Sequence, residues 1–153
     1  MRRLQLESEA AQEALGARLA ESAAGPLLIF LEGDLGAGKT TLTRGFLHGL
    51  GHRGAVKSPT YTLIEPYEID GRRVYHLDLY RVADPGELEY LGLREMLAED
   101  ATLLIEWAER GEGWLPTPDL RVVIRHLGSG RALELVALSP AGEGVLEGLG
   151  SNL

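Results

Sequence analysis

The segment Gly33–Thr40 constrains this chain more than any other. It is Gly-Asp-Leu-Gly-Ala-Gly-Lys-Thr and fits the pattern G-x-x-x-x-G-K-[ST]. The apolar run Leu27–Leu31 precedes it, and Thr41–Leu50 follows with apolar residues at helical spacing and Gly51 directly after. Because a strand, a glycine loop and a helix occur in this order, the segment predicts a P-loop that binds nucleotide phosphates.

Each residue type in this loop has a chemical role. The glycines let the backbone approach phosphate oxygens closely, and the amides together with the start of the following helix favour negative charge there. Lys39 is expected to bridge the β- and γ-phosphates of a nucleotide, and the Thr40 hydroxyl to bind Mg²⁺. Thr41 is placed for the α-phosphate. The predicted nucleotide-binding residues are consecutive: Gly33, Asp34, Leu35, Gly36, Ala37, Gly38, Lys39, Thr40 and Thr41.

Composition excludes several classes of protein. The 153 residues are 44% hydrophobic, which suits one globular P-loop domain over residues 1–153. The absence of cysteine excludes disulfides, thiolate zinc sites and cysteine nucleophiles. The apolar runs are too short to span a membrane and the first residues do not resemble a signal peptide, so we expect a cytoplasmic protein. The 15 basic and 23 acidic residues give a net charge of −8, which disfavours a broad nucleic-acid-binding face.

Sequence patterns predict how the strands pair. Ala101–Ile105 is a nearly continuous apolar run, typical of a parallel strand buried on both faces. Tyr61–Ile69 and Arg73–Tyr80 are predicted to form a hairpin, because Asp70-Gly71 between them favours a type I′ turn. Pro66 would place the first of these two strands at an edge of the sheet.

The remaining patterns complete an α/β fold. Strands are also expected over residues 3–7, 120–127 and 132–138, and helices after Ser8 and from Asp84 through Leu97. Asp84 is predicted to cap its helix, with Pro85 at the first position and Glu87 at the third. We therefore predict a P-loop NTPase-like fold: a mixed sheet with a parallel core, antiparallel hairpins at its sides and helices on both faces.

Two acidic residues are candidates for the chemistry beside the P-loop. Glu106 directly follows the apolar run that ends at Ile105, as the acid of a Walker B strand does. Asp78 ends a more alternating strand, which we expect to be less buried. Ligands bind at the carboxyl ends of parallel strands, where both acids would lie. The predicted catalytic residues are Lys39, Asp78 and Glu106, and the predicted metal-binding residues are Thr40, Asp78 and Glu106.

Four further residues near these segments have less specific interpretations. Thr60, in a Ser-Pro-Thr segment, could sense the metal and γ-phosphate, or it could simply belong to a turn that leads into a strand. Trp107 could cover part of the site, but a tryptophan that packs against the strand is the commoner case, and His76 is interpreted as structural too. Arg131, after a Gly-Ser-Gly turn, is expected to be a solvated arginine.

Four segments together carry a family resemblance: Gly33–Gly45, Ser58–Leu63, His76–Arg81 and Leu104–Arg110. In these segments the chain resembles the TsaE (YjeE) family, small bacterial ATPases of tRNA threonylcarbamoyladenosine (t6A) synthesis. The first segment is shared by many NTPases, whereas the combination of four in this order is specific to the family.

The resemblance implies an activity and partners. Proteins of this family bind ATP with Mg²⁺ and hydrolyse it slowly when alone. They act with TsaB and TsaD, which form the transferase that modifies adenosine 37 of certain tRNAs, and hydrolysis is thought to drive or reset that cycle. Asp78 and Glu106 then correspond to the family's acids for Mg²⁺ and water. The acidic composition agrees with tRNA being bound mainly by the partners.

Two other functions are compatible with a P-loop. A small-molecule kinase would transfer the phosphoryl group to an acceptor, but such kinases usually carry an arginine-rich lid, and no such segment is obvious in this chain. A nucleotide-dependent switch with negligible turnover would need no acid to position water. A GTPase is disfavoured because the N-K-x-D guanine motif is absent.

Overall fold

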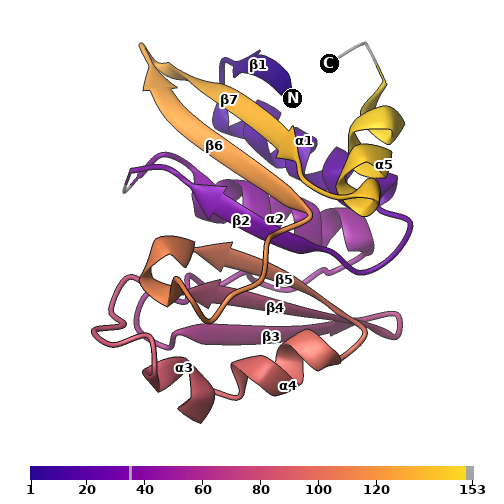
Figure 1. Cartoon of the computed structure of the whole chain (residues 1–153). Coiled ribbons are helices and arrows are strands. Elements are labelled where there is room, and N and C mark those ends of the chain that lie inside the picture. Colours follow the sequence, from indigo (N-terminus) through magenta and orange to yellow (C-terminus); the bar gives the residue numbers. More distant parts are fainter. Residues whose placement is uncertain (35, 151–153) are drawn as a thin grey trace.

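The computed structural model describes residues 1–34 and 36–150. Within them, a single mixed sheet has the strand order β1-β7-β6-β2-β5-β4-β3 (Figure 1). Its strands are β1 (Arg2–Leu6), β2 (Leu28–Glu32), β3 (Ile64–Ile69), β4 (Arg72–Asp78), β5 (Ala101–Glu106), β6 (Leu120–Leu127) and β7 (Gly130–Ala137). β6, β2, β5 and β4 run parallel, while β1–β7–β6 and β3–β4 pair antiparallel. The predicted mixed sheet with a parallel core is confirmed.

Helices cover both faces of this sheet, as predicted (Figure 1). One face carries α1 (Glu9–Ser22), α2 (Lys39–Leu50) and α5 (Pro140–Leu149), which share a buried apolar cluster with the strands beneath them. The other face carries α3 (Glu87–Tyr90), α4 (Leu93–Ala98) and the 3₁₀ helix η1 (Ala108–Gly111), over a second apolar cluster. No helix of the described residues is long and apolar enough to cross a membrane.

Several local predictions are confirmed. The Ser8 hydroxyl accepts a hydrogen bond from the Ala11 N–H at the start of α1, and Gly51 ends α2 in the left-handed conformation. Asp70 and Gly71 have φ of 50° and 79°, as a type I′ turn requires. All six residues of β5 are buried, in agreement with a central strand.

Two local predictions are wrong. The strand expected from Tyr61 begins only at Ile64, because the preceding residues form a turn. The helix expected from Asp84 begins at Glu87, and the Asp84 carboxylate accepts the Gly86 N–H within the turn before it. That helix is also divided into α3 and α4, because Gly92 adopts a left-handed φ of 81° that a continuing α-helix does not allow.

Helices α1 and α2 approach each other unusually closely. A Cβ atom on Gly45 would lie 1.9 Å from the Glu13 carbonyl oxygen, and one on Gly16 would lie 2.2 Å from the Leu42 carbonyl oxygen. Only glycine fits at these contacts. The close packing brings the first turn of α1 beside the P-loop.

We expect Gly45→Ala to destabilise the protein, because overpacking a tight contact costs about 1–3 kcal/mol. Gly144→Ala is the matched control: Gly144 is also helical, but a Cβ there would meet no atom within 4 Å. The control should gain about 0.5–1 kcal/mol from helix propensity alone. Urea unfolding of both variants tests this, and equal changes in the free energy of unfolding would contradict the close approach.

Candidate functional site

The P-loop connects β2 to α2, at the carboxyl end of β2. Asp78 ends β4 and Glu106 ends β5, and the two residues are direct partners in the parallel register. These strand ends lie side by side with the start of α2 (Figure 1). The structure therefore brings together the three residues predicted to be catalytic.

Lys39 links the P-loop to the acids. Its side chain is 5% exposed, and Nζ donates a hydrogen bond to the Gly33 carbonyl oxygen at 2.8 Å. The same Nζ lies 3.9 Å from Glu106 Oε1 and 4.2 Å from the centre of the Trp107 ring. Trp107, interpreted as structural, thus covers the cation of the site. A buried ammonium held between a glycine loop and a carboxylate is suited to bind phosphate oxygens.

Two residues that are distant in the sequence donate hydrogen bonds to carbonyl oxygens of the P-loop. Gln12 of α1 donates to the Ala37 carbonyl oxygen at 3.2 Å, and Arg131 of β7 donates to the same oxygen at 2.8 Å and to Gly36 at 3.3 Å. Arg131 is thus not the solvated arginine we expected. Because the C=O and N–H of a trans peptide point in opposite directions, the Gly38 N–H points away from these side chains. Gly38 has a φ of 111°, and a Cβ there would lie 2.4 Å from Gln12 Nε2.

The other predicted loop residues have different surroundings. Thr40 is half-buried in the first turn of α2. Thr41 is buried, and its hydroxyl donates to Glu9 Oε1 of α1 at 3.2 Å. Asp34 is exposed, and Leu35 lies outside the described residues. A cavity of about 230 Å³ borders the Thr41 side of the loop, between the start of α1 and the β6–β7 turn.

Asp78 is more deeply buried than its strand pattern indicated, at 4% exposure, because β4 lies inside the sheet. Its Oδ1 accepts the Tyr80 N–H at 2.9 Å, and its Oδ2 accepts the Thr60 hydroxyl at 3.3 Å. Burial raises the pKa of Asp78, with the nearby Glu106 charge acting in the same direction; the Tyr80 N–H and Lys39 oppose them. The contact with Thr60 places the Ser-Pro-Thr segment against this acid.

We expect Asp78→Asn to stabilise the nucleotide-free protein at pH 7 by on the order of 1 kcal/mol. The pKa of Asp78 in the folded state is raised above its ordinary value of 3.8, so the ionised group destabilises the fold above the folded-state pKa. This cost decreases as the pH falls and vanishes below 3.8. Thermal unfolding from pH 4 to 8 should show a gain that shrinks with acidity, absent in the exposed control Asp100→Asn. A loss of stability, or a gain independent of pH, would contradict the shift.

Glu106 is held by a residue that we interpreted as structural. Glu106 is 4% exposed, and its Oε2 lies 2.6 Å from Nε2 of the fully buried His76. Side chains two residues apart lie on the same face of a strand, so His76 and Asp78 share one face of β4. This spacing is the signal in the sequence that could have placed His76 beside the acids of the site.

The donor chemistry of the site fits Mg²⁺. Asp78 and Glu106 supply carboxylate oxygens and Thr40 a hydroxyl oxygen. Mg²⁺ prefers such hard oxygen ligands and is often bound by one or two carboxylates together with substrate phosphates.

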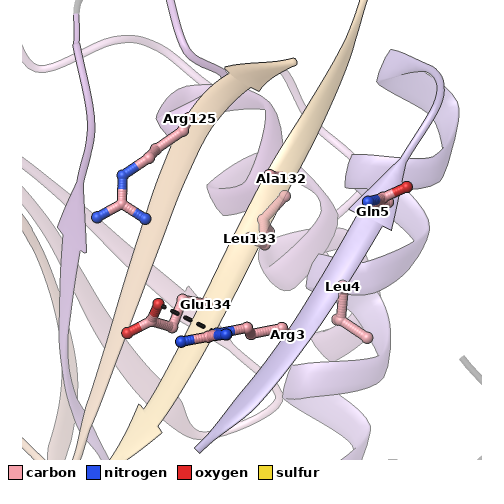
Figure 2. Close-up of a pocket in the computed structure, with 7 residues that line it drawn as sticks. All are labelled: Arg3, Leu4, Gln5, Arg125, Ala132, Leu133 and Glu134. Carbon is pink, nitrogen blue, oxygen red and sulfur yellow. Dashed lines mark ion pairs between the residues drawn. The ribbon is translucent and has the colours of Figure 1, made fainter.

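A hollow on the surface lies away from this site. It measures about 500 Å³ and is lined by residues of β1, β6 and β7, where Arg3 and Glu134 form an ion pair at 3.8 Å (Figure 2). None of the predicted site residues lines it.

Comparisons with known proteins show the family to which this chain belongs. A family model described as "Threonylcarbamoyl adenosine biosynthesis protein TsaE" matches residues 6–133. The protein with the name "tRNA threonylcarbamoyladenosine biosynthesis protein TsaE" from Haemophilus influenzae is 52% identical over 120 residues, 78% of this chain and 76% of that protein. Its namesake from Rickettsia conorii is 35% identical over 129 residues, 84% of this chain and 73% of that protein.

A solved structure shows the same fold. The crystal structure of Bacillus subtilis YdiB matches with a TM-score of 0.81 and 34% identity, and covers 97% of this chain and 93% of that chain. Since the family model spans most of the sequence and these relatives align over most of it, this chain belongs to the TsaE family of tRNA threonylcarbamoyladenosine biosynthesis proteins.

Proposed function

We propose that this protein binds ATP with Mg²⁺ and hydrolyses it to ADP and phosphate in support of t6A formation on tRNA. The observation that carries the proposal is the position of Lys39, whose ammonium lies between the Gly33 carbonyl oxygen and Glu106 Oε1. The P-loop, a buried cation and two adjacent strand-end acids are the parts that phosphoryl transfer requires.

Each residue has a role in the hydrolysis step. Lys39 and the loop amides neutralise charge on the β- and γ-phosphate oxygens. Thr40, Asp78 and Glu106 would hold Mg²⁺, which when bound supplies further positive charge to those oxygens. Glu106 orients a water whose oxygen bonds to the γ-phosphorus, while the bond from that phosphorus to the β–γ bridging oxygen breaks. The products are ADP and inorganic phosphate.

The proposed partners are TsaB and TsaD. The names of the relatives refer to tRNA threonylcarbamoyladenosine biosynthesis. The two partners are those that the family resemblance implies. We propose that hydrolysis drives or resets the transferase cycle in the cytoplasm. A net charge of −8 is consistent with indirect contact with tRNA through the complex.

Phosphate release from Mg²⁺–ATP tests this function, measured for the protein alone and with purified TsaB and TsaD. We expect slow release alone and faster release with both partners. A rate of phosphate release that is the same with and without TsaB and TsaD would contradict the proposed coupling of hydrolysis to these partners. ATP binding without release in any mixture would favour a switch, and a phosphorylated acceptor from a metabolite pool would favour a kinase. The same mixtures with the Lys39→Ala variant give the background.

A further inference from the structure

His76 and Glu106 meet because of the sheet register. His76 of β4 is paired with Leu104 of β5, and Asp78 is paired with Glu106. His76 and Glu106 are therefore diagonal neighbours on adjacent strands, and the His76 side chain extends toward the carboxyl end of β5 to contact Glu106. Because side chains alternate between the faces of a strand, Val74 lies on the same face of β4 as His76, and Leu104 lies on the same face of β5 as Glu106. Both Val74 and Leu104 pack in the apolar cluster beneath α2. Both the histidine and the carboxylate therefore lie on the sheet face from which Lys39 approaches.

The two oxygens of Glu106 have different neighbours. Oε2 lies 2.6 Å from His76 Nε2, whereas Oε1 lies 3.9 Å from Lys39 Nζ. The second distance is beyond hydrogen-bond range. The carboxylate is thus anchored through one oxygen, and the other oxygen is turned toward the cation of the P-loop.

The contacts of the imidazole indicate which nitrogen carries the proton. His76 is fully buried, and its Nδ1 has no hydrogen-bond partner among the described residues. A buried N–H without a partner costs about 1–3 kcal/mol, so a proton at Nδ1 is disfavoured. The proton then lies on Nε2, which donates it to Glu106 Oε2.

We propose that His76 is a positioning residue, which holds Glu106 so that Oε1 is available to the attacking water and remains at 3.9 Å from Lys39 Nζ, without a hydrogen bond to it. The inference rests on the proposed ATP hydrolysis. The terminal torsion of a glutamate is broad, so a free carboxylate next to an ammonium would rotate into a hydrogen-bonded ion pair. Such a pair would occupy both the water-orienting oxygen and the phosphate-binding cation. The His76 bond prevents this rotation.

Two substitutions separate the hydrogen bond from simple packing. His76→Leu removes the donor, while His76→Gln places an amide N–H where Nε2 lies. We expect kcat to fall by about 10- to 100-fold in the leucine variant, as for outer-shell partners of other catalytic ligands, and to be largely restored in the glutamine variant. ATP affinity should also fall in the leucine variant, because the released Glu106 carboxylate would pair with Lys39 and compete with phosphate for that cation, and it should be largely restored in the glutamine variant.

Tyr75→Phe is the matched control. It also removes a hydrogen bond from β4 to a carboxylate, that of the Tyr75 hydroxyl to Glu99 Oε2 at 2.7 Å, but outside the site. Its turnover should equal that of the unmodified protein. An unchanged kcat in His76→Leu would overturn the proposal. If His76→Leu does not fold, His76→Asn replaces it, since the shorter amide cannot reach Oε2, and equal turnover of the Gln and Asn variants would overturn the proposal.

A second readout is independent of turnover. Nitrogen-15 NMR of the imidazole groups should show His76 as the Nε2–H tautomer, with a proton resonance that shifts in Glu106→Leu. An Nδ1–H tautomer, or a resonance that ignores Glu106, would overturn the positioning contact. If the unmodified protein hydrolyses no ATP with or without partners, the proposed function fails, and the NMR result still decides whether His76 holds Glu106.

Discussion

Lys39→Ala is expected to abolish ATP hydrolysis and to weaken ATP binding by about 10- to 100-fold. The substitution removes a charge-assisted contact with phosphate, which contributes about 1.5–3 kcal/mol, and each 1.4 kcal/mol corresponds to a factor of ten. It also leaves Glu106 buried without its nearest cation, 3.9 Å away in the structure. Binding is measured by calorimetry and turnover by phosphate release.

The chain offers a matched control for this substitution. Lys57 is the only other lysine, and it is exposed at the start of the Ser-Pro-Thr segment. Lys57→Ala should bind and hydrolyse ATP as the unmodified protein does. Normal hydrolysis by Lys39→Ala would show that the P-loop is not the catalytic site.

Glu106→Gln is expected to retain ATP binding and to lose at least about 100-fold in turnover. The amide keeps the shape of the side chain, but it lacks the negative charge that orients a water and accepts its proton; positioned acids and bases of this kind typically contribute 10²–10⁴-fold. Single-turnover hydrolysis together with a separate measurement of ATP affinity distinguishes the two effects.

Glu109→Gln is the control for the loss of charge. Glu109 lies three residues further on, exposed on η1. Removing the Glu109 charge should leave both ATP affinity and turnover unchanged. A Glu106→Gln variant that turns over normally would remove Glu106 from the reaction, and an equal loss of binding and turnover would assign it to nucleotide binding alone.

The parts of the site that could be predicted are those that adjacent residues specify. The P-loop has a fixed local pattern, and Glu106 follows a buried run that only a central strand explains. The positive φ angles of Asp70 and Gly71 likewise follow from a dipeptide signal. The expected sheet follows from these elements because parallel strands need long connections and hairpins need short ones.

The parts that could not be predicted depend on contacts between distant segments. Gln12 and Arg131 hold the Ala37 carbonyl oxygen from 25 and 94 residues away, and no local pattern marks either of them. The burial of Asp78 depends on β4 lying between β3 and β5, which the alternation within β4 does not show. The break at Gly92 was missed because an isolated glycine is often tolerated within a helical pattern.

The most direct test of the central claim is a phosphorus-31 NMR time course of Mg²⁺–ATP with the protein in the presence of TsaB and TsaD. The proposed function predicts that the ATP resonances decay while ADP and inorganic phosphate grow in equal amounts, and that Lys39→Ala abolishes this change. ATP resonances that persist unchanged, or a γ-phosphoryl group that appears on another molecule, would contradict an ATPase.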